Sequence, residues 1–356
     1  MPILATKSTT SKPQHNLAFF MGLTLLGAAC GSNAAGTADA PLVDALALDA
    51  PVSVITPAQR QAAAQQTAVS HGDCTMLAPF YWEIGDKVGA QASGSTGDNS
   101  VVATTELPIA SSSKWLFGAY VAEVRAGVLT ADDIQHLHMM AGYTSFDDGS
   151  CDASVTTVDE CFATGTNSTL TSAKVGIFDY DGGHFQHWAT VNGMGTFTRA
   201  QLAADMQAKL GMDIDLRYYS PMLAGGAGTS AIQYAKFLRK ILNSQLKISA
   251  LLGTNAVCAD ANPATCITPP VGVPFAGSHY SMAHWVEDDR AGGDGAFSSA
   301  GLFGFYPWIN STKSQYGVLS RKAQAGTGGG PIGGAGRASM LCGRKLRLAY
   351  DSGAAQ

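Results

Sequence analysis

The sequence predicts an α+β fold, in which strands from both ends of the chain form one antiparallel sheet flanked by helices and a mainly helical lobe is inserted between them. Strand-like segments lie near residue 80 and near residue 300, and amphipathic helical segments lie between them. Of the 356 residues, 46% are hydrophobic and 14% are charged. This composition supplies enough apolar residues for a large core.

The first elements follow from local patterns. From Met76 onward, alternating apolar residues predict two strands around the turn Gly85-Asp86. The apolar segment 112–126 predicts a helix that Gly127 closes. Thr130-Ala-Asp-Asp133 then has the form of a capping box, with Asp in place of the usual Glu or Gln, and predicts that the next helix begins there.

The second half of the chain returns from loops and helices to strands. Residues 144–175 are expected to form loops, and residues 199–210 and 230–243 to form amphipathic helices. The aromatic segment 295–309 predicts one long strand region, followed by a turn at 310–314 and a further strand. A terminal helix is expected over residues 338–350.

The N-terminus has the pattern of an export signal. Lys7 and Lys12 precede a 13-residue apolar run, residues 17–29, which is too short to span a bilayer comfortably. LGAAC, ending at Cys30, resembles a bacterial lipobox, in which the cysteine is acylated after cleavage. We therefore expect a signal peptide over 1–29 and an exported, periplasmic protein, anchored to a bacterial membrane if Cys30 is acylated. Ordinary secretion is the alternative.

The composition changes after the signal. Residues 30–70 are rich in Ala, Gln and Thr and are expected to form a tether, helical around residues 57–68. One folded domain is expected over 71–356, with its helical lobe over roughly 130–260.

Six cysteines follow Cys30. An even number in an oxidising compartment predicts three disulfides. Cys151 and Cys161 bracket one short polar loop, Cys258 and Cys266 bracket another, and Cys74 and Cys342 remain to join the two ends of the domain.

Charge and histidine spacing argue against several classes of function. The net charge is −5 and the pI is near 5.9, so nucleic acid is not expected as a partner. His184 and His187 form H-x-x-H without the glutamate of a zinc-protease motif, so no metal site is predicted. We expect no cofactor.

Lys114 is the only charged residue between Glu106 and Glu123, and it follows three serines. Ser111 lies three residues before Lys114, so the two side chains share a helix face. Apolar surroundings disfavour an ammonium ion. A neutral amine beside a hydroxyl is a general base, and the hydroxyl then becomes a nucleophile. The alternative is a lysine that points into water behind serines that cap the helix.

Three segments in the same order resemble the serine β-lactamase and penicillin-binding-protein superfamily, over roughly residues 75–350. IASSSKWLFGAYVAEV looks like its nucleophile helix, SPMLAGGAGTSAIQYAKFLRKILN like its glycine-rich turn and following helix, and FSSAGLFGFYPWIN like the strand of its third motif. The resemblance is strongest to the class C-like branch, which includes esterases and peptidases. It implies a β-lactamase/transpeptidase-like fold.

The resemblance also implies roles for individual residues. Tyr180 matches the tyrosine of the family's Tyr-x-Asn motif and would take part in proton transfer, while Gly182 stands in place of the asparagine; Tyr143 is the alternative tyrosine. Ser299 stands where relatives carry a basic residue, and Gly301 keeps the glycine of that motif. The N–H groups of Ser111 and Leu302 would stabilise the oxyanion.

These features together predict an exported serine hydrolase that acts through an acyl-enzyme. Its partner would be a small ester, amide or peptide substrate, and an esterase-like preference is expected because Ser299 carries no charge. A β-lactamase or D-alanyl peptidase is one alternative. A non-catalytic lipoprotein that binds cell-wall fragments with the same fold is another.

Overall fold

The computed structural model describes residues 54–152, 154–260, 277–323 and 334–356. The predicted signal peptide, Cys30 and Cys266 lie outside these residues. The helices are α1 (Pro57–Ser70), α2 (Gly72–Thr75), α3 (Ser113–Val124), α4 (Ala131–Leu137), α5 (Val158–Ala163), α6 (Gly183–Ala189), α7 (Arg199–Leu210), α8 (Ala231–Leu242) and α9 (Gly334–Ser352). Short 3-10 turns include η1 (Ala110–Ser112) and η4 (Lys247–Leu251).

Eight of the strands form one antiparallel sheet in the order β2-β1-β13-β12-β11-β10-β9-β8. These strands are β1 (Phe80–Gly85), β2 (Ala90–Thr96), β8 (Val257–Cys258), β9 (His279–Ser281), β10 (His284–Glu287), β11 (Ala296–Ser298), β12 (Tyr306–Ile309) and β13 (Tyr316–Ser320). The N-terminal strand β1 pairs with the C-terminal strand β13, with Tyr81 opposite Ser320. The predicted sheet built from both ends of the chain is therefore confirmed.

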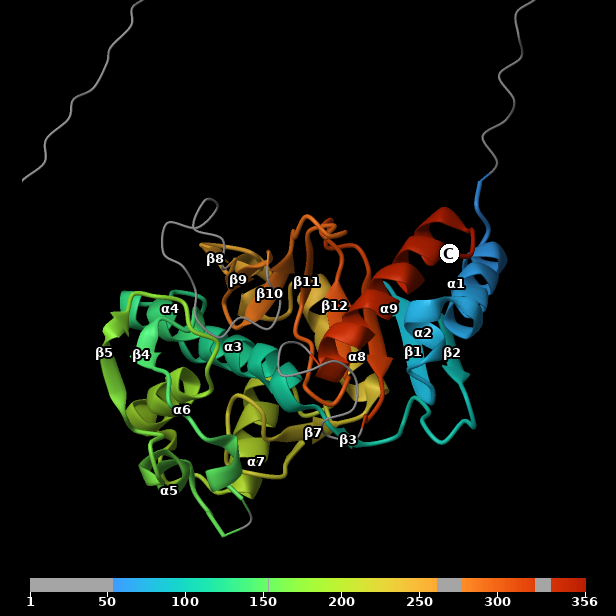
Figure 1. Cartoon of the computed structure of the whole chain (residues 1–356). Coiled ribbons are helices and arrows are strands. Elements are labelled where there is room, and N and C mark those ends of the chain that lie inside the picture. Colours follow the sequence, from blue (N-terminus) through green and yellow to red (C-terminus); the bar gives the residue numbers. More distant parts are fainter. Residues whose placement is uncertain (1–53, 153, 261–276, 324–333) are drawn as a thin grey trace, which may run out of the picture. The chain divides into compact units, whose positions relative to one another are not determined.

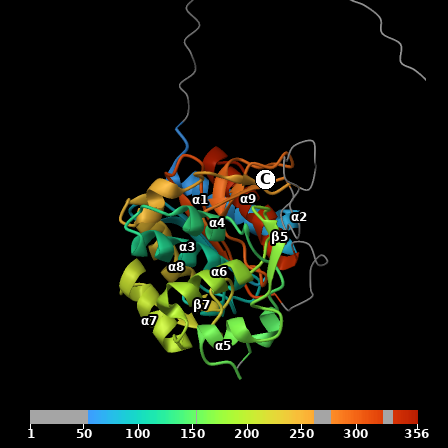
Figure 2. The same cartoon turned by 90° about the vertical axis from the view of Figure 1, so that its left-hand side faces the viewer.

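Helices cover both faces of this sheet (Figure 1). α9 packs against β12 and β13 and against α1, while α8 packs against β1, β12 and β13. Helices α4 to α7 form a lobe beside the sheet, as the two views show (Figures 1 and 2). The lobe also contains a two-stranded ribbon of β4 (Ala141–Tyr143) and β5 (Leu170–Val175).

A small second sheet, in the order β3-β7-β6, lies at the start of the segment that contains Ser111. Its strands are β3 (Leu107–Pro108), β6 (Arg217–Tyr218) and β7 (Ala227–Thr229). Through β3 and β7 it connects the chain before Ser111 to the glycine-rich turn before α8.

Helix α3 lies in the middle of the core. All of its residues from Ser113 to Ala122 are buried, because apolar side chains cover its whole circumference. The predicted helix ended at Ala126, and the structure ends α3 at Val124, with Gly127 in a left-handed conformation at φ +85°. A helix that is buried on all sides carries its polar residues into the interior as well.

The helix predictions after α3 are confirmed. Thr130 and Asp133 form the capping box at the start of α4, and both reciprocal hydrogen bonds are present. Helix α7 has the predicted bounds, and α8 differs by one residue at each end. The terminal helix α9 is longer than predicted, since it runs from Gly334 to Ser352.

Two element predictions were wrong. Residues 144–175 contain α5 and β5, which are each only six residues long. Most β5 side chains are exposed, so the strand has no apolar pattern to reveal it. The predicted strand over 295–309 is a hairpin of β11 and β12, with a tight connection in which Gly304 has φ +98°.

The stretch expected to be a tether ends in helix α1, as the sequence indicated, but this helix is not isolated. It packs against α9 and β2, with Ala63, Ala64 and Ala68 buried. Arg60 donates a hydrogen bond to the carbonyl of Tyr350 at 2.8 Å, which ties α1 to the C-terminal helix.

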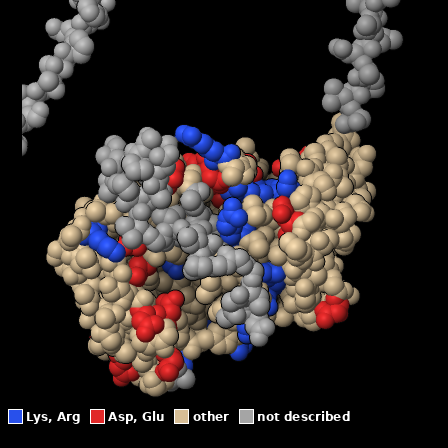
Figure 3. Space-filling model, viewed as in Figure 1, with Lys and Arg blue, Asp and Glu red and all other residues tan. Residues whose placement is uncertain are grey.

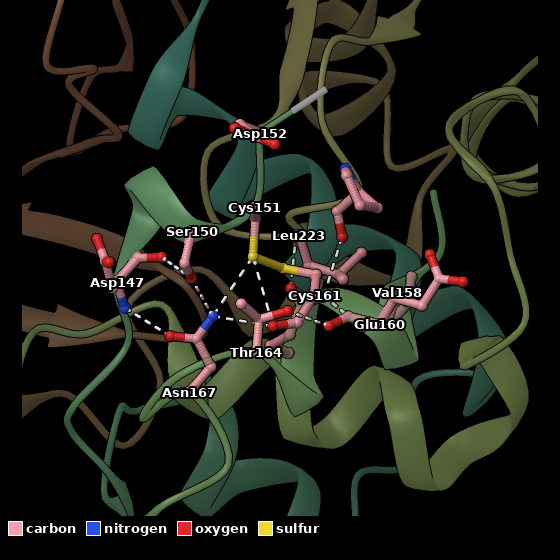
Figure 4. The surroundings of a disulfide bond; sticks show 12 residues. Asp147, Ser150, Cys151, Asp152, Val158, Glu160, Cys161, Thr164, Asn167 and Leu223 are labelled. Atoms are coloured by element: carbon pink, nitrogen blue, oxygen red, sulfur yellow. Dashed lines mark hydrogen bonds between the residues drawn. A yellow bond between two sulfur atoms is a disulfide. The ribbon is translucent and has the colours of Figure 1, made fainter. Parts of the chain in front are cut away.

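Two of the three predicted disulfides are present between described residues. Cys74–Cys342 joins α2 to α9 over a sequence separation of 268 residues, and Cys151–Cys161 closes a loop over a separation of 10 residues. Figure 4 shows the second disulfide among the polar side chains of this loop, where Asn167 donates to the carbonyl of Cys161 at 2.9 Å.

Removing the two disulfides should have unequal effects on stability. If a disulfide stabilises by restricting the unfolded chain, these separations correspond to about 3 kcal/mol for Cys151–Cys161 and roughly 5 to 6 kcal/mol for Cys74–Cys342. Urea unfolding of two double Cys→Ser variants measures the difference. Equal losses in the free energy of unfolding, or a larger loss for the Cys151–Cys161 variant, would contradict the idea that the long loop closed by Cys74–Cys342 gives the larger stabilisation.

Stability should also fall as the pH is lowered below 6.5. Burial lowers the pKa of His138 to about 4 and those of His184 and His284 to about 3. The unfolded chain binds protons at these three histidines near pH 6.5 and the folded chain does not. Each histidine therefore lowers the free energy of unfolding by about 2 kcal/mol between pH 7 and pH 5. Burial also raises the pKa of Asp181 to about 6, which acts in the opposite direction over the same range.

Burial, and then the neighbouring His136, also lower the pKa of the half-buried His187 to about 4, which adds a smaller loss. We therefore expect a net loss of at least about 4 kcal/mol in the free energy of unfolding between pH 7 and pH 5. Urea unfolding at the two pH values, followed by tryptophan fluorescence, measures it. Equal stability at both pH values would show that His138, His184 and His284 are protonated in the folded protein.

Candidate active site

The turn before α3 holds Ser111 in a constrained backbone. Ala110 has φ +45°, a left-handed conformation that is unusual for a residue with a Cβ. The N–H of Ile109 donates to the carbonyl of Ala227 at 3.0 Å, and the N–H of Ser112 donates to the carbonyl of Ile109 at 3.0 Å. These bonds fix the turn from both sides and place Ser111 where α3 begins.

Only one of the three consecutive serines has its hydroxyl directed to Lys114. Ser112 is fully buried, and its Oγ donates to the carbonyls of Ser299 and Phe305 at 2.6 and 3.2 Å. Ser113 is also buried, and its Oγ donates to the carbonyl of Ala110 at 2.6 Å. The hydroxyls of Ser112 and Ser113 are therefore bound to the backbone.

Lys114 is 5% exposed, and its amine lies among three groups from different parts of the chain. Its Nζ donates to Ser111 Oγ at 2.9 Å and to the carbonyl oxygen of Ala224 at 2.9 Å. The same Nζ lies 4.8 Å from the centre of the Tyr180 ring. None of the ion pairs between described residues includes Lys114. This lysine does not point into water, which was the alternative left open by the sequence.

Tyr180 is held in an aromatic cluster beside Lys114. Its ring stacks on Trp285 with centroids 5.2 Å apart and meets Tyr280 edge-on at 5.8 Å. Burial, and then the neighbouring Tyr180, raise the pKa of Tyr280 well above its usual value, so Tyr280 stays neutral. The Lys114 amine therefore contacts the face of the Tyr180 ring.

Gly182 stands at the position where the sequence resemblance implies an asparagine, and its surroundings leave little space for a side chain. A Cβ at this position would lie 3.2 Å from Ala224 Cβ and 3.2 Å from Phe146 Cδ1. The carbonyl of the same Ala224 accepts the Lys114 hydrogen bond. Ala224 therefore both crowds position 182 and supplies a backbone acceptor to Lys114.

The third motif packs directly against the nucleophile turn. Ser299 Oγ donates to the carbonyl of Ser111 at 3.0 Å. A Cβ on Gly301 would overlap the carbonyl oxygen of Ile109, so only glycine fits there. Leu302 follows with a side chain that is 60% exposed. The structure thus brings Ser111, Lys114, Tyr180, Ser299 and Gly301 together.

Two of the three cations that follow Ser299 most closely in sequence, Lys313 and Arg321, have other partners, while the third, Lys322, is exposed. Lys313 Nζ lies 3.4 Å from the carbonyl of Leu252 and 5.4 Å from the centre of the Phe297 ring. Arg321 is buried and donates to the carbonyl of Leu77 at 3.0 Å.

The two histidines of the H-x-x-H pattern have partners within the protein. His184 Nδ1 accepts from the Ala141 N–H at 3.1 Å, while His187 Nδ1 lies 2.8 Å from His136 Nε2. Tyr143, the alternative tyrosine, stacks on His187 with centroids 4.0 Å apart. Among the described residues, no group of three or more His, Cys, Asp or Glu could hold a metal ion.

Sequence reasoning missed the Ala224 carbonyl and the aromatic cluster around Tyr180. A backbone acceptor has no side-chain signature, and Tyr280 and Trp285 lie about 100 residues from Tyr180 in sequence. Their burial on neighbouring strands β9 and β10 becomes visible only when the sheet is assembled.

No protein-family model and no curated protein sequence matches the chain at a significant level. Solved structures do match. The D-amino acid amidase from Ochrobactrum anthropi SV3 has a TM-score of 0.59 with 10% identity over 83% of this chain and 98% of that one. EstCE1, a hydrolase with promiscuous acyltransferase activity, has a TM-score of 0.58 with 12% identity over the same shares.

A penicillin-binding protein from Bacillus halodurans has a TM-score of 0.54 with 13% identity, over 75% of this chain and 95% of that one. The three similarities confirm the predicted fold: this chain has the β-lactamase and penicillin-binding-protein fold. They extend over nearly the full length of each relative.

Replacing neighbouring serines should separate chemistry from stability. Ser111→Ala should abolish hydrolysis of an ester substrate and leave the melting temperature nearly unchanged, because its hydroxyl has one hydrogen bond at the edge of the core. Ser112→Ala should lower the stability by about 1–3 kcal/mol, because it breaks two buried hydrogen bonds. Melting curves and initial rates of both variants measure this. If Ser112→Ala lost all activity and Ser111→Ala kept full activity, the nucleophile would be Ser112 and not Ser111.

Proposed function

We propose that this protein is a serine hydrolase that cleaves esters or amides through an acyl-enzyme, with Ser111 as nucleophile and Lys114 as general base. The observation that carries the proposal is the 2.9 Å hydrogen bond between Lys114 Nζ and Ser111 Oγ inside the core. The arrangement has the required order, with a nucleophile, a base within reach and further groups that orient the base.

The proposed acylation step begins with attack of Ser111 Oγ on the substrate carbonyl carbon, while its proton passes to the amine of Lys114. The amine becomes an ammonium ion, which the Ala224 carbonyl and the Tyr180 ring face both stabilise. The bond to the leaving group then breaks, and the leaving group takes a proton. Water attacks the acyl-enzyme in the second half of the cycle.

Two backbone N–H groups are proposed to stabilise the oxyanion, those of Ser111 and Leu302. No hydrogen bond between described residues uses either group. Donors of this kind contribute about 3–4 kcal/mol each in serine hydrolases. Tyr180 is proposed to protonate the leaving group or relay that proton, since its ring lies against the lysine that would take part in the transfer.

The substrate preference follows from the charge at the third motif. Ser299 supplies a neutral hydroxyl that donates to the Ser111 carbonyl, and the nearby Lys313 and Arg321 are bound elsewhere. A substrate carboxylate would therefore find no charge-assisted partner in Ser299, Lys313 or Arg321, and such a partner contributes about 1.5–3 kcal/mol. We infer that uncharged acyl groups, such as those of short-chain esters, are preferred over β-lactams and peptide C-termini.

We also infer that the protein is exported and held to a bacterial membrane through an acylated Cys30. The two disulfides support an oxidising compartment. None of the described helices is long and apolar enough to cross a membrane. On the parts of the face in Figure 3 that are not grey, acidic and basic side chains are both present without a continuous basic band, which gives no support to nucleic acid as a partner.

Turnover of esters and β-lactams tests the preference. Wild-type protein should hydrolyse p-nitrophenyl acetate or butyrate far faster than nitrocefin or penicillin. Ser299→Lys should raise the rate of penicillin acylation relative to ester hydrolysis, because it adds the missing cation. The matched control is Ser299→Ala, which removes the same hydroxyl without adding charge and should not favour penicillin.

Efficient hydrolysis of nitrocefin without ester activity would show that another group holds the carboxylate. No hydrolysis of either substrate class would favour a non-catalytic protein that binds cell-wall fragments.

A further inference from the structure

The carbonyl of Ala224 belongs to a tight turn, residues 219–226, that precedes α8. The turn closes on itself, because the Tyr219 N–H donates to the Gly226 carbonyl at 2.7 Å and the Gly226 N–H donates to the Met222 carbonyl at 2.9 Å. An asparagine side chain can adjust its own torsion angles to reach a lysine, but a backbone carbonyl moves only with its loop. The position of the Ala224 acceptor therefore depends on what holds this turn.

Gln186, a residue of α6, holds this turn in place. Its side chain is fully buried and uses both ends of its amide. Its Nε2 donates to the carbonyl of Pro221 at 2.9 Å, and its Oε1 accepts from the N–H of Leu223 at 3.3 Å. One side chain thus binds the backbone on both sides of Met222, at Pro221 and at Leu223, and Leu223 directly precedes Ala224.

The same amide reaches a third segment. Gln186 Nε2 also donates to the carbonyl of Val158 at 3.1 Å, at the first residue of α5. Helix α5 contains Cys161 of the Cys151–Cys161 disulfide, and Met222 packs against the small apolar cluster around this disulfide. Figure 4 shows Leu223 and Val158 around this disulfide. Gln186 is therefore fixed to a braced part of the lobe.

We propose that Gln186 is a positioning residue, which sets the Ala224 carbonyl so that it orients the Lys114 amine toward Ser111. The inference rests on the proposed hydrolase function. Gln186 touches neither the reacting atoms nor the substrate, and it acts through the turn. The Gln186 amide would orient the Lys114 amine indirectly, through the turn, whereas an asparagine at position 182 would bind it directly. Gly182 leaves the space that Ala224 occupies in this turn.

The test compares Gln186→Met with wild-type protein in p-nitrophenyl acetate hydrolysis. Methionine keeps the volume but cannot bond to Pro221 or Leu223, so kcat should fall about tenfold or more while KM changes less than twofold, because small misplacements of a catalytic group are costly. Hydrogen exchange of the Leu223 amide should accelerate. Gln186→Asn, which keeps the amide on a shorter side chain, should show the same pattern and decides the question if Gln186→Met does not fold.

The matched control is Gln207→Met on α7. Gln207 donates to the carbonyl of Ile214 at 2.9 Å, a similar clamp on a loop that does not reach Lys114. This variant should keep kcat within twofold of wild type.

The outcomes are distinguishable. A wild-type protein without esterase activity would overturn the proposed function, and this inference with it. An active wild type whose Gln186 variants have the kcat of Gln207→Met would overturn the positioning role alone, as would a loss that appears only in KM.

Discussion

The hydrogen bond between Lys114 and Ser111 constrains the rest of the structure, because Lys114 lies in a helix that is buried on all sides. An amine in such a place is costly unless polar groups surround it. The protein meets this requirement with an acceptor from the turn before α8, an aromatic face from the lobe and the serine itself. These groups come from three segments, so the small sheet, the lobe and α8 have to meet at one point. The same polar groups that make burial of Lys114 tolerable also stabilise the ammonium ion that the proposed chemistry forms.

The nucleophile turn shows how neighbouring residues of one type take different roles. Ser112 and Ser113 bind backbone carbonyls, and these bonds hold the turn against the third motif. Ser111, with Ala110 in a left-handed conformation before it, is left to face the lysine. Gly301 completes the contact because any side chain there would enter the Ile109 carbonyl. Close packing of backbone on backbone therefore holds the segment around Gly301 against the Ser111 turn without a basic residue at position 299.

Much of this could be predicted from the sequence. Apolar periodicity and capping residues located α3, α4, α7 and α8 closely, because these helices have strong local signals. The spacing of Ser111 and Lys114 predicted their contact. The short elements α5 and β5 were missed, since six residues with exposed side chains give little pattern. The Ala224 carbonyl could not be foreseen, because any residue can supply a carbonyl and only the fold decides which one. Gln186 could not be foreseen either: it lies among polar and apolar residues of α6, between His184 and His187, and its partners are backbone groups that carry no sequence signal.

The central claim is that the buried amine makes Ser111, and no other serine, a nucleophile. Intact-mass measurement after exposure to a fluorophosphonate, followed by peptide mapping, tests it most directly. The account predicts a single adduct on the peptide that contains Ser111, absent in Ser111→Ala and formed far more slowly in Lys114→Met. An unmodified wild-type protein, an adduct on another residue, or labelling of Lys114→Met at the wild-type rate would contradict it.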